Sequence, residues 1–586
     1  MSPDSLKEPP PDGAVAPLPA GTVTFLFTDI QGSTRLLREL GVAYATLLTD
    51  HDRLMQEAIE RHNGRVFGHE GDAVFAAFAD APSAINAAID GQRALAAHAW
   101  PQETRLRVRM GIHTGQAITR GSGYMGMSLH QAARIRIAPR RVCCRAGRSR
   151  EPRSYDLLDE PDRRLFERLS VFAGGAGLTQ IEEVCGPASD VGGEILDGLG
   201  SLVEKSLLRS VPGNGLEPRF AMLATIREYA LEHLGERGEV PTMRHRHAAA
   251  YVAIAETCAP HLTGVEAAQH LSQLDLEHDN LRAAIEWAVE RGDAELAHRF
   301  GAALWRFWQV RGHLHEATER IRRILETPGA DDLSPALRSR ALGAAGSIAY
   351  WSADAEGTGR YYPMALEAAR HADDPRLLAE ATYNAGFHAI GAGGRRLRFA
   401  AGRDWFEEAL RLYREVDDEV GVANATWALG LSLLAGEDES ARELFHESLA
   451  LYRRVHNRFG EGWALHMIGL MDVIERRPDD AERRFRESAE IFAETEDRSA
   501  NVLLLLDLAL VAKERGELER FWTLAGASDA LSKKTGIGLA GSIEDFVNVD
   551  PPERPVGNLD AERAWDAGAA LEADEAMALA LGERRS

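Results

Sequence analysis

Two aspartates in the N-terminal part of the chain could hold a metal ion together. Asp29 ends a segment in which Val23, Phe25 and Phe27 alternate with other residues, and Asp72 stands in a tight turn between two apolar segments. If these segments pair in one sheet, the two carboxylates converge at its edge, where they repel each other unless a cation lies between them. Mg²⁺ suits such a site because it takes oxygen ligands and substrate phosphates.

The loop that follows Asp29 could bind the phosphates of a nucleotide. Ser33 is a good N-cap for a helix that we predict from about residue 34 to residue 62. Free amides at a helix N-terminus favour anions, so a triphosphate fits this position. A lone aspartate here would more often be a turn or cap residue, but the shared setting of the two favours the metal site. The candidate phosphate-binding residues are Ile30, Gln31, Gly32, Ser33 and Thr34.

The elements that would position these residues follow the order βαββαββα, which predicts an α+β domain with a sheet covered by helices. After the first strand and the first helix, the hydrophobic patterns predict strands at 66–67 and 74–78, a helix at 81–99, a strand at 106–112, a short strand after a turn at 113–115, and a helix at 128–137.

Composition bounds the remaining possibilities. The chain has 586 residues, a net charge of −23 and 45% hydrophobic residues, which indicates a globular protein of about four domains. An acidic surface argues against nucleic acid as a partner. The four cysteines have no zinc-ligand spacing, which favours reduced thiols. The sequence has no apolar stretch long enough to span a membrane and no signal peptide, so we expect a cytoplasmic protein. Residues 1–20 are Pro-rich and are expected to be a disordered tail.

The C-terminal half contains repeats. Phe406, Phe445 and Phe485 are 39 and 40 residues apart, and a second aromatic track of Tyr413, Tyr452 and Phe492 keeps the same spacing. Each repeat has the pattern of a two-helix unit, so residues 240–535 are predicted to form a TPR-like helical solenoid that binds a protein partner. Residues 536–586 are expected to be a helical tail. Trp305 and Trp308 are interpreted as core residues, and His245 and His247 as surface residues.

Residues 21–138 resemble the class III nucleotidyl cyclases. Residues 27–34 look like the first metal motif of that family, 70–72 like the second, 110–115 like its dimerisation strand, and 124–134 like its transition-state helix. The resemblance implies a ferredoxin-like fold and a homodimer that converts ATP or GTP to a cyclic nucleotide and pyrophosphate with Mg²⁺ or Mn²⁺. It also implies metal ligands at Asp29, Ile30 and Asp72 of one chain and a catalytic Arg134 from the other.

Three positions depart from that pattern. Gly68 replaces the lysine that usually selects adenine, Gly123 stands where a second base-reading residue is usual, and His130 replaces a ribose-orienting asparagine. The domain is also incomplete, because the family's later strands and a phosphate-binding lysine are missing. Losing one transition-state donor costs about 10²–10³ in rate. The alternative reading is therefore an inactive nucleotide-binding or dimerisation module in a transcription-regulator-like protein.

A second resemblance covers residues 154–586. Residues 154–239 look like the winged-helix segment of bacterial STAND-type regulators, expected here to be all-α apart from a possible hairpin at 207–220, and residues 277–284 begin a TPR-like sensor. No GxxxxGK[ST] motif is present, so the ATPase of those regulators is missing. The Arg-rich segment 139–153 stands in its place and is expected to be a linker. In the resembled architecture the winged helix packs against the ATPase rather than reading DNA, so nucleic acid is an unlikely partner.

Overall fold

The computed structural model describes most of the chain. The described residues are 21–30, 40, 43–70, 73–98, 100, 106–120, 123–125, 155, 157–211, 213, 218–391, 400–434, 440–539 and 552–582. They form two compact units. The first contains the N-terminal sheet and most of the winged-helix region, and the second contains residues 171–185, residues 211–219 and every helix from α10 onwards.

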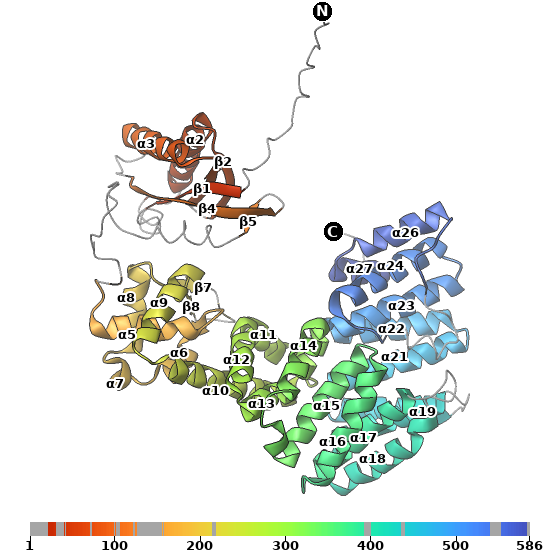
Figure 1. Ribbon diagram of the computed structural model, residues 1–586. Coiled ribbons are helices and arrows are strands. Elements are labelled where there is room, and N and C mark those ends of the chain that lie inside the picture. Colours follow the sequence, from red (N-terminus) through yellow and green to blue (C-terminus); the bar gives the residue numbers. More distant parts are fainter. Residues whose placement is uncertain are drawn as a thin grey trace, which may run out of the picture. The chain divides into compact units, whose positions relative to one another are not determined.

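The N-terminal sheet has five strands in the order β2-β3-β1-β4-β5, with antiparallel neighbours throughout (Figure 1). The strands are β1 (Gly21–Ile30), β2 (Arg65–Glu70), β3 (Ala73–Phe78), β4 (Val108–Arg120) and β5 (Gly123–Met125), and the helices between them are α2 (Ala43–Arg61) and α3 (Ala81–Ala97). The predicted α+β architecture is confirmed over these residues.

Alternation along the strands produces two differently packed faces. One face carries Leu26, Val74 and Phe78, which form a core with α2 and α3. The other face carries Phe25 and Phe27 in a smaller cluster with Phe67 and Phe75. Side chains of successive strand residues point to opposite faces, so this division follows directly from the sequence pattern.

Local signals explain where the elements begin and end. Asp80 caps α3, because its side chain accepts a hydrogen bond of 2.8 Å from the amide of Ser83. Asn63 has a φ of 58° in the turn that separates α2 from β2. The prediction of a break at residues 113–115 was wrong, because β4 runs through them without interruption. The helix expected at 128–137 lies outside the described residues.

The winged-helix region contains short helices and a small sheet in the order β6-β8-β7. The hairpin expected at 207–220 is confirmed by β7 and β8, whereas β6 was not anticipated. The elements are α5 (Glu160–Arg168), β6 (Ala176–Gly177), α6 (Leu178–Cys185), α7 (Ala188–Val191), α8 (Ile195–Glu204), β7 (Arg209–Val211), β8 (Arg219–Ala221) and α9 (Ala224–Glu236).

A buried polar network within the second unit ties β8 and the chain before β6 to α12 (His278–Arg291). The Arg219 guanidinium donates to both carboxylate oxygens of Glu277 and to the carbonyl of Gly175. Asn280 accepts a hydrogen bond of 2.8 Å from the amide of Ala173 and donates to the carbonyl of Gly175, also at 2.8 Å. The residues of the 277–284 motif that resembled a regulator family therefore have a structural role here.

The remainder of the second unit is helical, and successive helices lie side by side (Figure 1). Besides α12, the helices are α10 (Val240–Cys258), α11 (Ala267–Leu276), α13 (Ala294–Val310), α14 (Leu314–Leu325), α15 (Pro335–Trp351), α16 (Ala355–Arg370), α17 (Pro375–Gly391), α18 (Arg403–Glu415), α19 (Glu419–Leu434), α20 (Ser440–Arg454), α21 (Arg458–Ile474), α22 (Pro478–Ala493), α23 (Arg498–Glu514), α24 (Leu518–Thr535), α26 (Leu559–Ala569) and α27 (Ala573–Ala580).

The aromatic repeat positions are buried, as their spacing predicted. Phe406, Phe445 and Phe485 are each 0% exposed. Each ring packs on a glycine of the preceding helix, so that a Cβ on Gly430 would stand 2.9 Å from a ring carbon of Phe445, and one on Gly469 would stand 2.7 Å from Phe485. Glycine is needed at these positions because the ring occupies the space that a side chain would fill.

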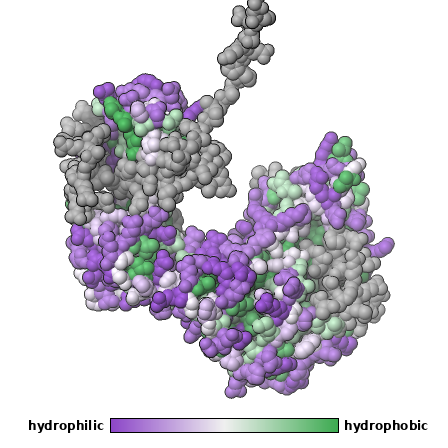
Figure 2. All heavy atoms as spheres, viewed as in Figure 1, coloured by the Kyte–Doolittle hydropathy of each residue, from purple (hydrophilic) through white to green (hydrophobic). Residues whose placement is uncertain are grey.

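The surface of the described residues is mainly hydrophilic, with apolar side chains showing between the charged ones (Figure 2). Cys185 and Cys258 are buried and form no disulfide bond among the described residues. Within the described residues, no helix combines the length and the apolar character that crossing a bilayer requires.

Candidate functional site

Asp29 forms an ion pair across the sheet with Arg109. The two residues stand directly opposite each other in the antiparallel pairing of β1 with β4, on the face that α2 and α3 leave uncovered. The Arg109 Nη2 atom lies 2.5 Å from the Asp29 Oδ2 atom, and the side chains are 30% and 19% exposed. The carboxylate is thus held near the end of the central strand β1, partly accessible, and neutralised by one cation.

The strand that follows Asp72, β3, lies beside the end of β1. The Thr28 Oγ1 atom accepts a hydrogen bond of 3.2 Å from the amide of Val74. Ala73 pairs with Glu70 across the β2–β3 hairpin, and Asp72 immediately precedes Ala73 in the sequence. The strand order confirms that β1 and the hairpin are neighbours, which was the condition for the two-aspartate hypothesis. Asp72 itself lies outside the described residues.

Ile30 has its side chain in the core. It is 1% exposed and belongs to the cluster that packs against α2 and α3. Only its main-chain atoms could therefore contact a metal ion or a nucleotide. The other candidate loop residues, Gln31, Gly32, Ser33 and Thr34, lie outside the described residues, as do His130 and Arg134.

The two glycines that replace base-reading residues both lie in strands. Gly68 is in β2 at a register shift against β3, opposite Phe75. A Cβ at Gly68 would stand 3.3 Å from the Phe75 ring, which is a tight but adjustable contact. Gly123 begins β5 and pairs with Arg120 of β4. Neither glycine can supply the side-chain hydrogen bonds that distinguish adenine from guanine.

Sequence reasoning missed Arg109 as a member of this site. The local pattern shows Arg109 only as a polar residue between Val108 and Met110 in its strand. A signal was present, because a strand-end carboxylate and a basic residue on a neighbouring antiparallel strand can meet once the register is known. The register itself depends on long-range pairing that the local pattern does not contain.

Comparison with known proteins supports two domain assignments. Residues 15–129 match the family described as the adenylate and guanylate cyclase catalytic domain. The N-terminal part is similar to a nucleotide cyclase. Residues 158–235 match the winged helix-turn-helix domain family.

Individual relatives include both transcriptional regulators and adenylate cyclases. A "Putative HTH-type transcriptional regulator" of Mycobacterium tuberculosis is 31% identical over 294 residues, which are 49% of this chain and 32% of that protein. An adenylate cyclase of Podospora anserina is 31% identical over 147 residues, which are 21% of this chain and 7% of that protein. The chain thus spans about a third of the length of the regulators that it matches first.

One solved structure is similar over much of the chain. It is a signal-transduction ATPase with numerous domains and a tetratricopeptide repeat sensor from Pyrococcus horikoshii, 12% identical, with a TM-score of 0.34. The match covers 71% of this chain and 63% of that protein. A TM-score of this size is too low to establish a shared fold.

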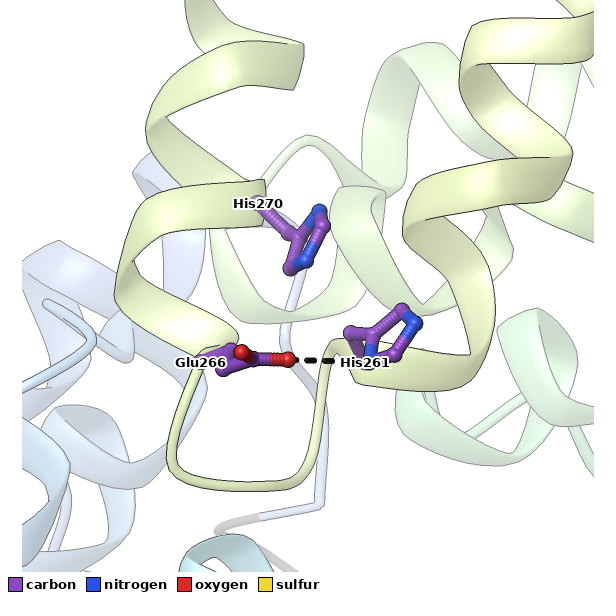
Figure 3. A group of neighbouring side chains, drawn as sticks. All are labelled: His261, Glu266 and His270. Atoms are coloured by element: carbon purple, nitrogen blue, oxygen red, sulfur yellow. Dashed lines mark ion pairs between the residues drawn. The ribbon is translucent and has the colours of Figure 1, made fainter.

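A histidine–glutamate cluster is the one group in the described residues with the composition of a metal site (Figure 3). His261 pairs with Glu266 at 3.3 Å, and the rings of His261 and His270 are stacked, with centroids 4.6 Å apart and planes inclined by 17°. Imidazole lone pairs lie in the ring plane, so those of two stacked rings run parallel and do not converge on one ion. The cluster is an ion pair with a ring stack as it stands.

Two histidines and two tryptophans were predicted to lie at the surface and in the core, respectively. His247 is 3% exposed and contacts Asn280, so its assignment to the surface was wrong, whereas His245 is exposed as expected. Trp308 is 1% exposed and lies in the core, which confirms that prediction. Trp305 is only half-buried and lines a cavity.

Proposed function

We propose that this chain is a signal-transduction regulator whose N-terminal domain binds ATP or GTP with a divalent metal ion and forms a cyclic nucleotide and pyrophosphate. The observation that carries the proposal is the position of Asp29 near the end of β1, beside the β2–β3 hairpin to which Asp72 belongs in the sequence. The match of residues 15–129 to the cyclase catalytic domain supports the same activity.

The described candidate ligands, Asp29 and the main chain of Ile30, offer oxygen atoms that fit a hard divalent cation. Asp29 offers a partly exposed carboxylate, and oxygen is the ligand atom that Mg²⁺ and Mn²⁺ prefer. Asp29, the main chain of Ile30, and Asp72 would hold the metal, which would supply charge stabilisation at the phosphates. Arg109 would then have to share the Asp29 carboxylate with the incoming cation, so metal binding competes with the ion pair.

The catalytic arrangement in this proposal needs two copies of the chain. Arg134 of one copy would stabilise the developing charge on a nucleotide held by Asp29 and Asp72 of the other, and His130 would stand at the ribose-orienting position. The homodimer would form through residues 21–138, with residues 139–153 as the linker to the C-terminal part.

Gly68 favours a second candidate, a domain that binds nucleotide with little turnover. The position lacks a side chain and lies in an irregular part of β2, so base recognition through a buried hydrogen bond is absent there. Discrimination built on such bonds reaches about 10⁴–10⁵. In this version the N-terminal domain senses a nucleoside triphosphate, and the signal is its occupancy or its dimerisation.

We further propose that the winged-helix region, residues 154–239, does not read DNA. A DNA-reading surface needs free basic side chains. Several basic side chains of this region are already ion-paired, including Arg168 with Glu239 and Lys205 with Asp162. The helical repeats, residues 240–535, would be the scaffold that binds a protein partner, and residues 536–586 a helical extension of it.

Calorimetric titration of the full chain with ATP or GTP tests the metal-dependent site. We expect binding with Mg²⁺ or Mn²⁺, and none when EDTA removes the metal. Asp29→Asn and Asp72→Asn should each abolish the metal-dependent heat. Unchanged titrations in both variants would refute the two-aspartate site.

A matched control separates this effect from a general loss of negative charge. Glu57 lies on α2, is 52% exposed and pairs only with Arg53 among the described residues, so Glu57→Gln removes one surface charge away from the site. This variant should titrate like the unchanged protein. A thermal melt of each variant confirms that the sheet remains folded.

A further inference from the structure

The helical repeats enclose a cavity that none of the assigned functions uses. It has a volume of about 340 Å³ and lies entirely within the second unit, between α13 and the helices α15 to α21. Its wall is rich in aromatic side chains, with Trp305, Trp427, Phe459 and Trp463 among them. Val420 on its wall is 38% exposed, so this part of the wall reaches solvent.

One cation stands in this aromatic wall. The Arg306 guanidinium carbon lies 4.0 Å from the ring centre of Trp305 and 4.5 Å from that of Phe459. Its Nη1 atom donates a hydrogen bond of 2.9 Å to the side chain of Gln309. Among the described residues, no carboxylate oxygen lies within ion-pair distance of Arg306.

The neighbouring arginines have carboxylate partners, so the lack of one at Arg306 is unusual for this part of the chain. Arg299, two turns earlier on α13, pairs with Glu256 at 2.6 Å, and Arg311, just after the helix, pairs with Asp275 at 2.8 Å. Arg306 has longer-range attraction from the carboxylates of Asp497 and Glu380, and the Asp497 Oδ1 atom already accepts hydrogen bonds from the amides of Ser499 and Ala500. Burial lowers the pKa of Arg306 to about 10, so the guanidinium remains charged near neutral pH.

Other polar groups on the wall are also unpartnered. The Trp463 Nε1 and His466 Nδ1 atoms are buried and make no hydrogen bond, and their side chains are 9% and 1% exposed. Tyr350 and Tyr383 also line the cavity; they are half-buried, and their hydroxyls have no hydrogen-bond partner among the described residues. Leaving buried polar groups unpaired costs free energy, so a ligand that satisfies them would be bound favourably.

Size and lining together define the class of ligand. An apolar cavity of about 150 Å³ holds one benzene ring, so a cavity of 340 Å³ has room for a two-ring body. The lining rings favour stacking with a flat molecule, and an unpaired guanidinium favours one negative group. Apolar cavities with a few fixed polar groups are the usual form of small-molecule sites.

We propose that this cavity binds a small organic anion with an aromatic body, whose negative group pairs with Arg306 and whose rings stack among the lining aromatic side chains. The site is separate from the nucleotide site of the N-terminal domain. It does not depend on cyclase activity.

Calorimetry on the full chain with indole-3-acetate and its uncharged amide, indole-3-acetamide, tests the charge requirement. We expect the acid to bind at least about tenfold more tightly than the amide, because one charged hydrogen bond is worth about 1.5–3 kcal/mol. Arg306→Gln should remove this preference. Arg299→Gln, on the same helix and paired with Glu256 outside the cavity wall, should retain it.

Folding and ligand source are checked in the same preparations. A cooperative thermal melt shows whether Arg306→Gln remains folded, because the substitution also removes the stacking of the guanidinium on Trp305 and Phe459. Equal affinities for acid and amide, or an Arg306→Gln variant that still prefers the acid, would overturn the proposal. Displacement of indole-3-acetate by 3′,5′-cyclic AMP or GMP would show that the cavity accepts a cyclic nucleotide as its anion, and no displacement would exclude these two nucleotides.

Discussion

Two glycines three residues apart on α15 should respond oppositely to the same substitution. At Gly346 an added Cβ would stand 2.3 Å from the Cδ1 atom and 2.5 Å from the Cε1 atom of Tyr362, a ring that is 3% exposed and bonded to Ser347. At Gly343 the nearest atom would be the Asn384 Nδ2 atom at 3.8 Å, an ordinary contact. Gly346→Ala therefore forces α15 and α16 apart, whereas Gly343→Ala only improves helix propensity.

The expected magnitudes follow from these contacts. Replacing a helical glycine by alanine gains about 1 kcal/mol when space is free. Overpacking a rigid buried ring costs about 1–3 kcal/mol. The two variants should thus differ by roughly 1–3 kcal/mol in free energy of unfolding, and by several degrees in Tm at about 2–4 °C per kcal/mol for a large domain.

Tryptophan fluorescence during thermal unfolding is the appropriate assay. All tryptophans except Trp100 lie in the second unit, so the signal reports mainly the helical repeats. Gly343→Ala should melt at or above the temperature of the unchanged protein and Gly346→Ala below it. Equal melting temperatures would refute the reasoning, because they would mean that the ring of Tyr362 does not occupy the space beside Gly346.

The remaining predictions concern the repeats. Phe445→Ala removes a ring that is 0% exposed and should lower the stability of the second unit by about 3–5 kcal/mol in urea unfolding. Leu518→Ala, at a position that is 59% exposed, should stay within about 0.5 kcal/mol and serves as its control. Burial and the nearby His278 lower the pKa of His313 from 6.5 to about 4. The unfolded chain then binds the proton more readily, so this residue's contribution to stability is complete above pH 6.5 and is lost as the pH falls towards 4. His313→Gln should flatten melting temperature against pH over that interval, and an unchanged slope would contradict the shift.

Local patterns in the sequence were enough for most of the elements. The alternation of Val23, Phe25 and Phe27 predicted both the strand and the separation of its two faces. The spacing of Phe406, Phe445 and Phe485 predicted buried repeat positions, because one helix pair recurs with one packing contact. These features depend on periodicity within a segment, which the sequence records directly.

The features that were missed depend on contacts between distant segments. Arg109 meets Asp29 only through the register of β1 with β4. Trp305 and Trp308 have the same helical spacing, but only the surrounding helices decide that one lines a cavity and the other lies in the core. The break predicted at residues 113–115 was wrong because pairing with β1 keeps that segment extended despite its turn-like residues.

Mass spectrometry of reaction products tests the central claim most directly. The purified full chain is incubated with Mn²⁺ and either ATP or GTP, beside the Asp72→Asn variant. We predict a 3′,5′-cyclic nucleotide and pyrophosphate from the unchanged protein, formed slowly because Gly68 and His130 replace side chains that assist turnover, and neither product from the variant. Cyclic nucleotide at the same level in both preparations, or in neither, would contradict the proposed activity.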